Sequence, residues 1–124
     1  MIIVTCGILY FKNKILITQR NKNKKEFPLF WEFPGGKANI NETIIDCISR
    51  EIKEELNLYI DFKEIIFIKN NYLNKYNLYY CKCNIINIDN IKMNNEIKDY
   101  KLVNKEELIN YNLIPGDKEI INLI

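Results

Sequence analysis

The sequence predicts an α+β fold in which a mixed β-sheet is sandwiched between α-helices. Three observations support this. Two β-rich segments, 2–10 and 15–19, stand on either side of a short polar run. Apolar residues recur at helical spacing in the middle of the chain. A second pair of β-rich segments follows, and two short helix-like segments close the sequence.

The first two segments predict a β-hairpin with its turn at 11–14, and a polar loop then leads to the stretch WEFPGGK at 31–37. A helix is expected to begin at Asn41, a good N-cap, with Glu42 in its first turn, and to end at Asn57. The apolar residues expected to face the core are Ile45, Ile48, Ile52 and Leu56.

Beyond the helix, two strands are expected at 65–70 and 76–86, joined around 73–76. A further strand is expected near 97–103, and short helices at 104–109 and 115–124. With 124 residues and no linker or repeat, the chain is expected to be one domain over 1–124.

The composition excludes several classes of protein. A hydrophobic content of 48%, with 27% charged residues, is that of a folded globular chain. The net charge of +2 indicates no stable nucleic-acid partner and no membrane-binding face. No apolar run is long enough to span a membrane, and no secretory signal is evident. A cytoplasmic monomer is therefore expected.

The cysteine and histidine content limits the catalytic mechanisms that are possible. The four cysteines, Cys6, Cys47, Cys81 and Cys83, are expected to be buried and reduced, because no other feature indicates secretion. Without histidine, a serine–histidine or cysteine–histidine triad is excluded. Catalysis must then depend on carboxylates, Lys, Arg, Tyr or a metal ion.

Two motifs have more than one reading when taken alone. Gly35-Gly36 suits a tight turn, and it equally suits a backbone that comes close to a ligand. In REIKEEL, the side chains of Glu51, Glu54 and Glu55 fall within an arc of about 100° on one helix. They form either a solvated acidic face or an oxygen-rich site for a hard cation such as Mg²⁺.

The spacing of the two motifs decides between these readings. From Gly36 through Glu42 and Arg50 to Leu58, the sequence resembles the Nudix box, G-x5-E-x7-R-E-U-x-E-E-x-G-U, in which U is aliphatic. Every position matches except the final glycine, which here is Asn57. That position usually takes a left-handed backbone, which Asn tolerates next best after Gly.

The resemblance extends to the MutT-like branch of the Nudix hydrolases, through WEFPGGK, the two hairpins and the final PGDKEIINLI. It implies the Nudix fold and a Mg²⁺-dependent hydrolase that cleaves nucleoside triphosphates to a monophosphate and pyrophosphate, with Mn²⁺ as a substitute. Cytidine, guanine or oxidised nucleotides are the expected substrates, and clearing damaged or surplus nucleotides is the expected role.

The resemblance also implies roles for residues of the metal site. The metal ligands are expected to be Glu51, Glu54 and Glu55, a backbone carbonyl of the Gly35-Gly36 loop, and Glu96 in the loop before the last strand. Arg50 is expected to position a glutamate, and Glu42 to support the start of the helix or the ligands.

For the substrate, Arg20 and Lys37 are expected to contact phosphate. Candidates for a base-stacking slot are Phe33, Leu78 and Tyr80, although core packing explains each equally well. Asp117 occupies the position at which MutT-like enzymes read the base with Asn and CTP pyrophosphohydrolases carry Asp. The alternative for Asp117 is a packed C-terminal helix.

Two other functions remain open from the sequence. The first is a Nudix hydrolase of dinucleoside polyphosphates, ADP-ribose or capped RNA. The second is a non-catalytic Nudix domain that binds a nucleotide, although such domains typically lose glutamates of the box and this chain keeps them all.

Overall fold

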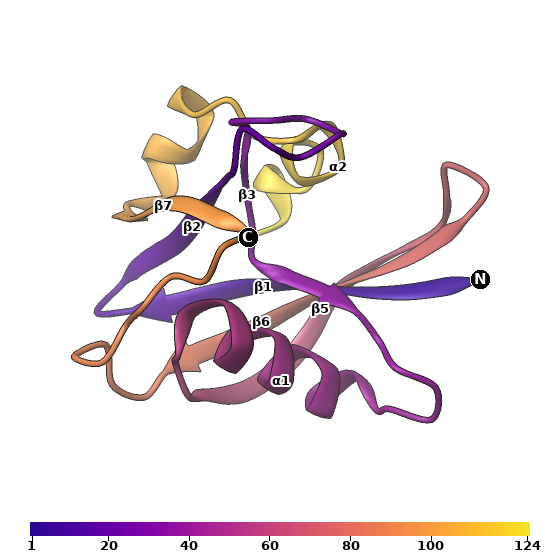
Figure 1. The fold of residues 1–124 in the computed structure, drawn as a ribbon, viewed down its shortest axis with the longest axis horizontal. Helices are drawn as coiled ribbons and strands as arrows, with labels where there is room; N and C mark the ends of the chain where they lie inside the picture. The colour runs from indigo at the N-terminus through magenta and orange to yellow at the C-terminus, as the bar shows by residue number, and fades with distance from the viewer.

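The structure, a computed structural model, describes residues 1–124 and contains a seven-stranded sheet with helices on both sides (Figure 1). The elements in chain order are β1 Ile2–Phe11, β2 Lys14–Arg20, β3 Trp31–Glu32, β4 Gly35–Lys37, α1 Ile44–Leu56, β5 Ile60–Tyr72, β6 Tyr76–Ile85, β7 Ile97–Val103, the 3₁₀-helix η1 Lys105–Asn110, α2 Pro115–Lys118 and the 3₁₀-helix η2 Ile121–Leu123. None of the helices is long and apolar enough to cross a membrane.

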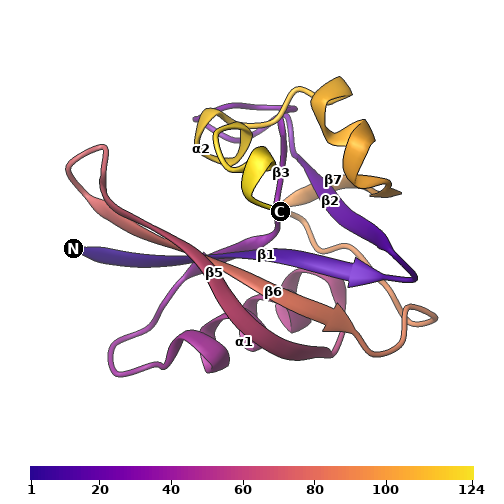
Figure 2. The same cartoon turned by 180° about the vertical axis from the view of Figure 1, so that it is seen from behind.

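The sheet is mixed, as the sequence predicts. Its main path runs β3-β2-β1-β6-β5, with β4 paired to β1 and β7 paired to β2. The central strands β1 and β6 are parallel, and the other pairs are antiparallel. The β5–β6 hairpin projects from the body of the protein beside the N-terminus (Figures 1 and 2). β5 is longer than expected, because its pairing with β6 continues through several register shifts.

Alternation along the central strands creates two cores. Ile8 and Ile17 point to the face covered by η1, α2 and η2, whereas Leu9 and Leu16 point to the face covered by α1. Figures 1 and 2 show α1 on one side of the sheet and the C-terminal helices on the other. The expected sandwich of a mixed sheet between helices is therefore confirmed.

Helix α1 begins two residues later than expected. Thr43, in extended conformation, accepts a hydrogen bond from the Asp46 amide (3.1 Å) and is the N-cap. Asn41 instead has a left-handed φ of 66°, so its assignment as the cap is wrong. Ile45 is 49% exposed rather than in the core, and Cys47 takes the buried place on that turn. The end is as expected: Asn57 is left-handed, with φ 55°.

All four cysteines are free and buried, which agrees with the expected reduced thiols. Cys81 and Cys83 alternate with the outward-facing Lys82 on β6, and both pack in the core under α1. Burial raises the pKa of both thiols to about 12. They are therefore apolar packing groups at neutral pH.

Candidate active site

A cleft of about 640 Å³ opens where α1, β4, the loop 21–30 and the start of α2 meet. All the candidate site residues from the sequence line it except Glu42, Arg50 and Tyr80. Those that line it are Arg20, Phe33, Gly35, Gly36, Lys37, Glu51, Glu54, Glu55, Leu78, Glu96 and Asp117. The fold thus brings together residues that lie nearly one hundred positions apart in the sequence.

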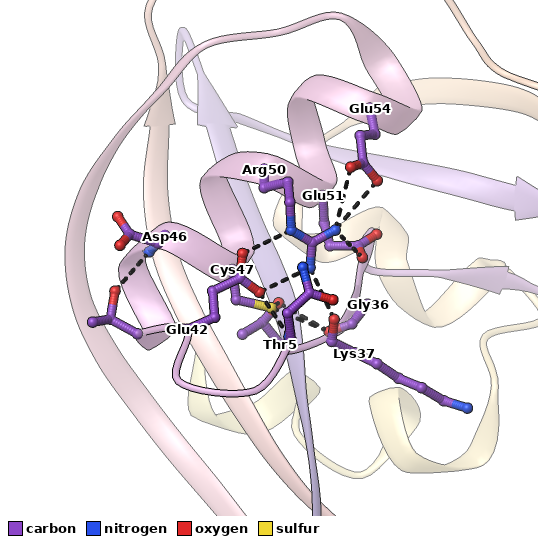
Figure 3. A network of polar contacts seen from close by, with 11 residues as sticks. Thr5, Gly36, Lys37, Glu42, Asp46, Cys47, Arg50, Glu51 and Glu54 are labelled. Atoms are coloured by element: carbon purple, nitrogen blue, oxygen red, sulfur yellow. Dashed lines mark hydrogen bonds and ion pairs between the residues drawn. The ribbon is translucent and has the colours of Figure 1, made fainter.

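Arg50 organises the acidic residues at the rim of the cleft (Figure 3). Its Nε and Nη2 donate to the two oxygens of Glu42, at 2.7 and 2.9 Å. Its Nη1 donates to Glu51 (2.9 Å) and to Glu54 (3.3 Å), and Nη2 also donates to the Lys37 carbonyl (3.0 Å). One guanidinium therefore links α1, which we also call the box helix, the loop before it and β4.

Glu42 belongs to this network rather than to the first turn of α1. Its carboxylate accepts from Arg50 and from the Asn39 amide (2.9 Å). These hydrogen bonds lower the pKa of Glu42 to about 2. Glu42 is therefore ionised at neutral pH and keeps Arg50 in place beside Glu51 and Glu54.

Gly36 makes room for Glu51. A Cβ built on Gly36 would lie 2.4 Å from Cδ of Glu51, so only glycine allows the carboxylate to approach the backbone here. The Gly36 carbonyl accepts from Thr5 Oγ1 (3.3 Å) and from Cys47 Sγ (3.6 Å). Of the two expected carbonyl ligands, the Gly36 oxygen is therefore already bonded in the interior.

Glu55 is the most unusual carboxyl in the cleft. It is 8% exposed, and its Oε1 is the one buried side-chain oxygen or nitrogen with no hydrogen-bond partner. Burial, together with the nearby carboxylates of Glu51, Glu32 and Glu96, raises the pKa of Glu55 to about 9, and a backbone hydrogen bond from Gly35 opposes the rise. An unpartnered buried oxygen among like charges is the environment that a bound cation relieves.

Burial also raises the pKa of Glu51, and Glu54 and Glu96 add to this rise while Arg50 opposes it. No three acidic or cysteine side chains converge closely enough to hold a metal ion as they stand. The donors themselves fit a hard divalent cation, because all are oxygens and one of them, Oε1 of Glu55, is buried without a partner.

Glu96 reaches the cleft from the loop between β6 and β7. Its side chain is 55% exposed and pairs with Lys24 at 3.7 Å. It lines the same cleft as Glu51 and Glu55, and its negative charge raises the pKa of both. Lys24, in the loop 21–30, is a cleft residue that the sequence did not single out.

Glu32 is a further cleft residue missed by sequence reasoning. Nη1 of Arg20 contacts both of its oxygens, at 3.1 and 3.2 Å, while Nε of Arg20 donates to the Glu26 carbonyl (3.1 Å). Burial raises the pKa of Glu32, and Arg20 opposes this rise. The signal was present in WEFPGGK, which carries Glu32 on the strand paired with the end of β2.

The apolar end of the cleft differs from expectation at one residue. Phe33 and Leu78 line it, although each is largely buried. Tyr80 is fully buried and does not reach the cleft, so its assignment as a base-stacking residue is wrong. It points to the same face of β6 as Leu78 but lies farther along the strand, where its hydroxyl contacts Asp117 of α2.

The Tyr80 hydroxyl holds Asp117, which is 2% exposed. One Asp117 oxygen accepts from Tyr80 (3.0 Å) and the other from the Phe33 amide (2.8 Å). Burial raises the pKa of Asp117 to about 7, and the two hydrogen bonds oppose the rise. Asp117 therefore joins α2 to β6 and to the end of β3, beneath the apolar end of the cleft.

This geometry predicts different outcomes for two substitutions at Asp117. Asp117→Ala leaves the buried Phe33 amide and Tyr80 hydroxyl unpaired and should lower the free energy of unfolding by about 1–3 kcal/mol. Asp117→Asn should cost less than about 1 kcal/mol, because its oxygen accepts from Phe33 and its amide donates to the rotatable Tyr80 hydroxyl. Urea denaturation measures both, and equal stability of the two variants would contradict the role of Asp117 as a clamp.

A mixed sheet between helices, with a helix of clustered glutamates against a Gly-Gly strand and an acidic cleft, is the architecture expected of a Nudix domain. The family model described as "NUDIX domain" matches residues 1–124. The chain belongs to the NUDIX family.

Individual relatives agree with this assignment. An 8-oxo-dGTP diphosphatase of Buchnera aphidicola subsp. Schizaphis graminum is 46% identical over 57 residues, which cover 46% of this chain and 43% of that protein. The match thus spans less than half of the relative.

Two solved structures share the fold. The solution structure of the E. coli ORF135 protein has a TM-score of 0.80 at 23% identity and covers 99% of this chain and 87% of its own. An ADP-ribose pyrophosphatase of Streptococcus suis 89-1591 has a TM-score of 0.80 at 21% identity. The match covers 98% of this chain and 87% of that protein's chain.

Proposed function

We propose that this protein is a divalent-cation-dependent nucleoside triphosphate pyrophosphohydrolase, which releases a nucleoside monophosphate and pyrophosphate. The observation that carries the proposal is Oε1 of Glu55, buried and unpartnered beside Glu51 in a cleft that also contains basic side chains. A site of fixed carboxylates suits a cation that binds phosphate oxygens, and Mg²⁺, with Mn²⁺ as a substitute, is the cation of choice.

The cation would be held by Glu51, Glu54 and Glu55, with Glu96 and the Gly35 carbonyl as further ligands. When bound, it would neutralise charge on the phosphates and lower the pKa of an attacking water. Arg50 orients Glu51 and Glu54 through its hydrogen bonds (Figure 3). It is thus a positioning residue, and Glu42 keeps it in place.

Three basic side chains are available to the phosphates. Arg20 and Lys24 line the cleft but are paired with Glu32 and Glu96, respectively. Lys37 lines the cleft without an ion-pair partner, and its side chain extends away from the Arg50 network (Figure 3). Lys37 therefore offers its full charge to a polyphosphate, whereas Arg20 is held in a fixed position by Glu32.

For the base, we propose a guanine or cytosine, with oxidised guanine included. The Buchnera relative named 8-oxo-dGTP diphosphatase supports the oxidised form. Phe33 and Leu78 offer an apolar wall, and Asp117 lies directly behind Phe33. Each Asp117 oxygen keeps one lone pair beyond the bonds from Tyr80 and Phe33, and a base edge with N–H donors is the partner that we propose for the ionised form.

An assay of released products across a panel of nucleotides tests this function. The panel contains 8-oxo-dGTP, dGTP, CTP, UTP, dTTP, ADP-ribose, a dinucleoside tetraphosphate and a capped RNA. Guanine- or cytosine-type triphosphates are expected to outrank UTP and dTTP by about tenfold, the effect of one unpaired hydrogen-bonding group. Preferred hydrolysis of ADP-ribose, the dinucleotide or capped RNA would overturn the proposed substrate class.

The same assay tests the cation. Excess EDTA is expected to lower turnover at least about 100-fold, since the metal contributes several kcal/mol to transition-state stabilisation. Activity in Mg²⁺ should rise from acid to mildly alkaline pH, because Glu51 and Glu55 have raised pKa values and must lose their protons to bind a cation. Full activity in EDTA would overturn the proposal.

A further inference from the structure

The one departure from the box motif, Asn57, makes contacts that glycine cannot make. Its backbone is left-handed (φ 55°, ψ 39°), the conformation for which the family uses glycine. Its side-chain Nδ2 donates to the carbonyl of Asn90 at 2.9 Å, and its Oδ1 accepts from Nζ of Lys53. The sequence alone suggests that Asn57 only replaces glycine, but these two bonds give it an additional role.

Asn90 belongs to the segment 86–96 between β6 and β7, which we call the Glu96 loop. This loop closes the C-terminal end of α1. The amide of Lys92 donates to the Leu56 carbonyl (2.9 Å), and the amide of Asn94 donates to the Glu55 carbonyl (2.9 Å). These carbonyls in the last turn of a helix have no partner within the helix, so the loop supplies them.

The same loop carries Glu96 into the cleft. The side-chain oxygen of Asn94 accepts from the Glu96 amide at 3.0 Å, and the Asn94 carbonyl accepts from the Ile97 amide at 3.3 Å. Asn94 and Glu96 both line the cleft. Hydrogen bonds thus connect the end of α1, which carries Glu54 and Glu55, to the loop that carries Glu96.

We propose that Asn57 is a positioning residue that fastens the Glu96 loop to the box helix and so holds Glu96 beside Glu55. A glycine at 57 keeps the backbone conformation and the cap, but it loses the bond to the Asn90 carbonyl. The effect on catalysis rests on the proposed function, whereas the fastening of the loop does not.

Hydrogen exchange in the metal-free protein tests the fastening directly. In Asn57→Gly, the amides of Lys92 and Asn94 should exchange about threefold to tenfold faster, the effect expected for one lost hydrogen bond. The matched control is Asn13→Gly, since Asn13 is also left-handed (φ 65°) but lies exposed in the β1–β2 turn with no side-chain hydrogen bond. Unchanged exchange in Asn57→Gly, or equal acceleration in Asn13→Gly, would overturn the proposal.

A double-mutant cycle tests the route to Glu96. Asn57→Gly should raise the Mg²⁺ concentration for half-maximal activity and lower kcat about threefold to tenfold, with little change in the KM for nucleotide. In a Glu96→Gln background, adding Asn57→Gly should change neither quantity further. If the effects of the two substitutions were fully additive, Asn57 would not act on catalysis through Glu96, and that part of the proposal would be overturned. A parent protein without hydrolytic activity would overturn the proposed function instead, and the exchange measurement would still decide the fastening.

Discussion

Glu51→Gln and Glu54→Gln are each expected to lower turnover at least about 100-fold, because a neutral amide is a poor ligand for a hard cation and the metal contributes several kcal/mol to the barrier reduction. The two side chains differ in environment, since that of Glu51 is 15% exposed and that of Glu54 is 56% exposed. A shared loss of activity despite this difference would indicate a shared ligand role. Steady-state kinetics at saturating Mg²⁺ measures it.

Glu64→Gln is the matched control, because Glu64 is exposed on β5 and does not line the cleft. It should leave turnover unchanged. Thermal melts of the two box variants should stay near that of the parent, since neither substitution empties a packed site. A loss of less than about threefold in both variants would remove Glu51 and Glu54 from the metal site, given the size of the effect expected there.

The strands were predictable because their patterns are local. β-rich runs separated by polar turns predict both hairpins, and the left-handed Lys12 and Asn13 form the first turn where it was expected. The start of α1 was less predictable, because Asn41 and Thr43 are both good N-caps. In the structure Thr43 accepts the bond from the Asp46 amide, whereas Asn41 has a left-handed backbone.

Much of the candidate site was predictable because the box fixes it along one helix and one loop. The spacing from Gly36 to Glu55 determines which side chains share a face of α1, and the structure places them on the cleft. Leu78 and Tyr80 share one face of β6, so their alternation does not distinguish them; Leu78 lines the cleft, whereas Tyr80 lies farther along the strand and is buried against Asp117 of α2, a contact between distant segments that the sequence does not reveal. The contacts of Glu32 and Asn57 likewise depend on tertiary packing.

Gly35→Ala is expected to lower the stability of the protein, whereas Gly36→Ala is expected to lower its activity. A Cβ on Gly35 would lie 2.0 Å from the Thr5 carbonyl oxygen and 2.8 Å from its carbon, both in the backbone of the central strand β1. Strand β4 would have to move away from β1, so Gly35→Ala should lower the free energy of unfolding by about 3 kcal/mol or more. Urea denaturation measures this loss.

Gly36→Ala meets a different neighbour. Its Cβ would lie 2.4–2.7 Å from the carboxylate atoms of Glu51, which stand at the end of a flexible side chain. The carboxylate can rotate away, so the free energy of unfolding should change by less than about 1 kcal/mol, as is usual for substitutions that disrupt no core packing. Turnover should nevertheless fall about 100-fold, because a misplacement of about 1 Å in a catalytic group has an effect of that size. If Gly36→Ala kept full activity, the place of Glu51 beside β4 would have no part in catalysis. If it unfolded as readily as Gly35→Ala, the second glycine would serve the sheet and not the site.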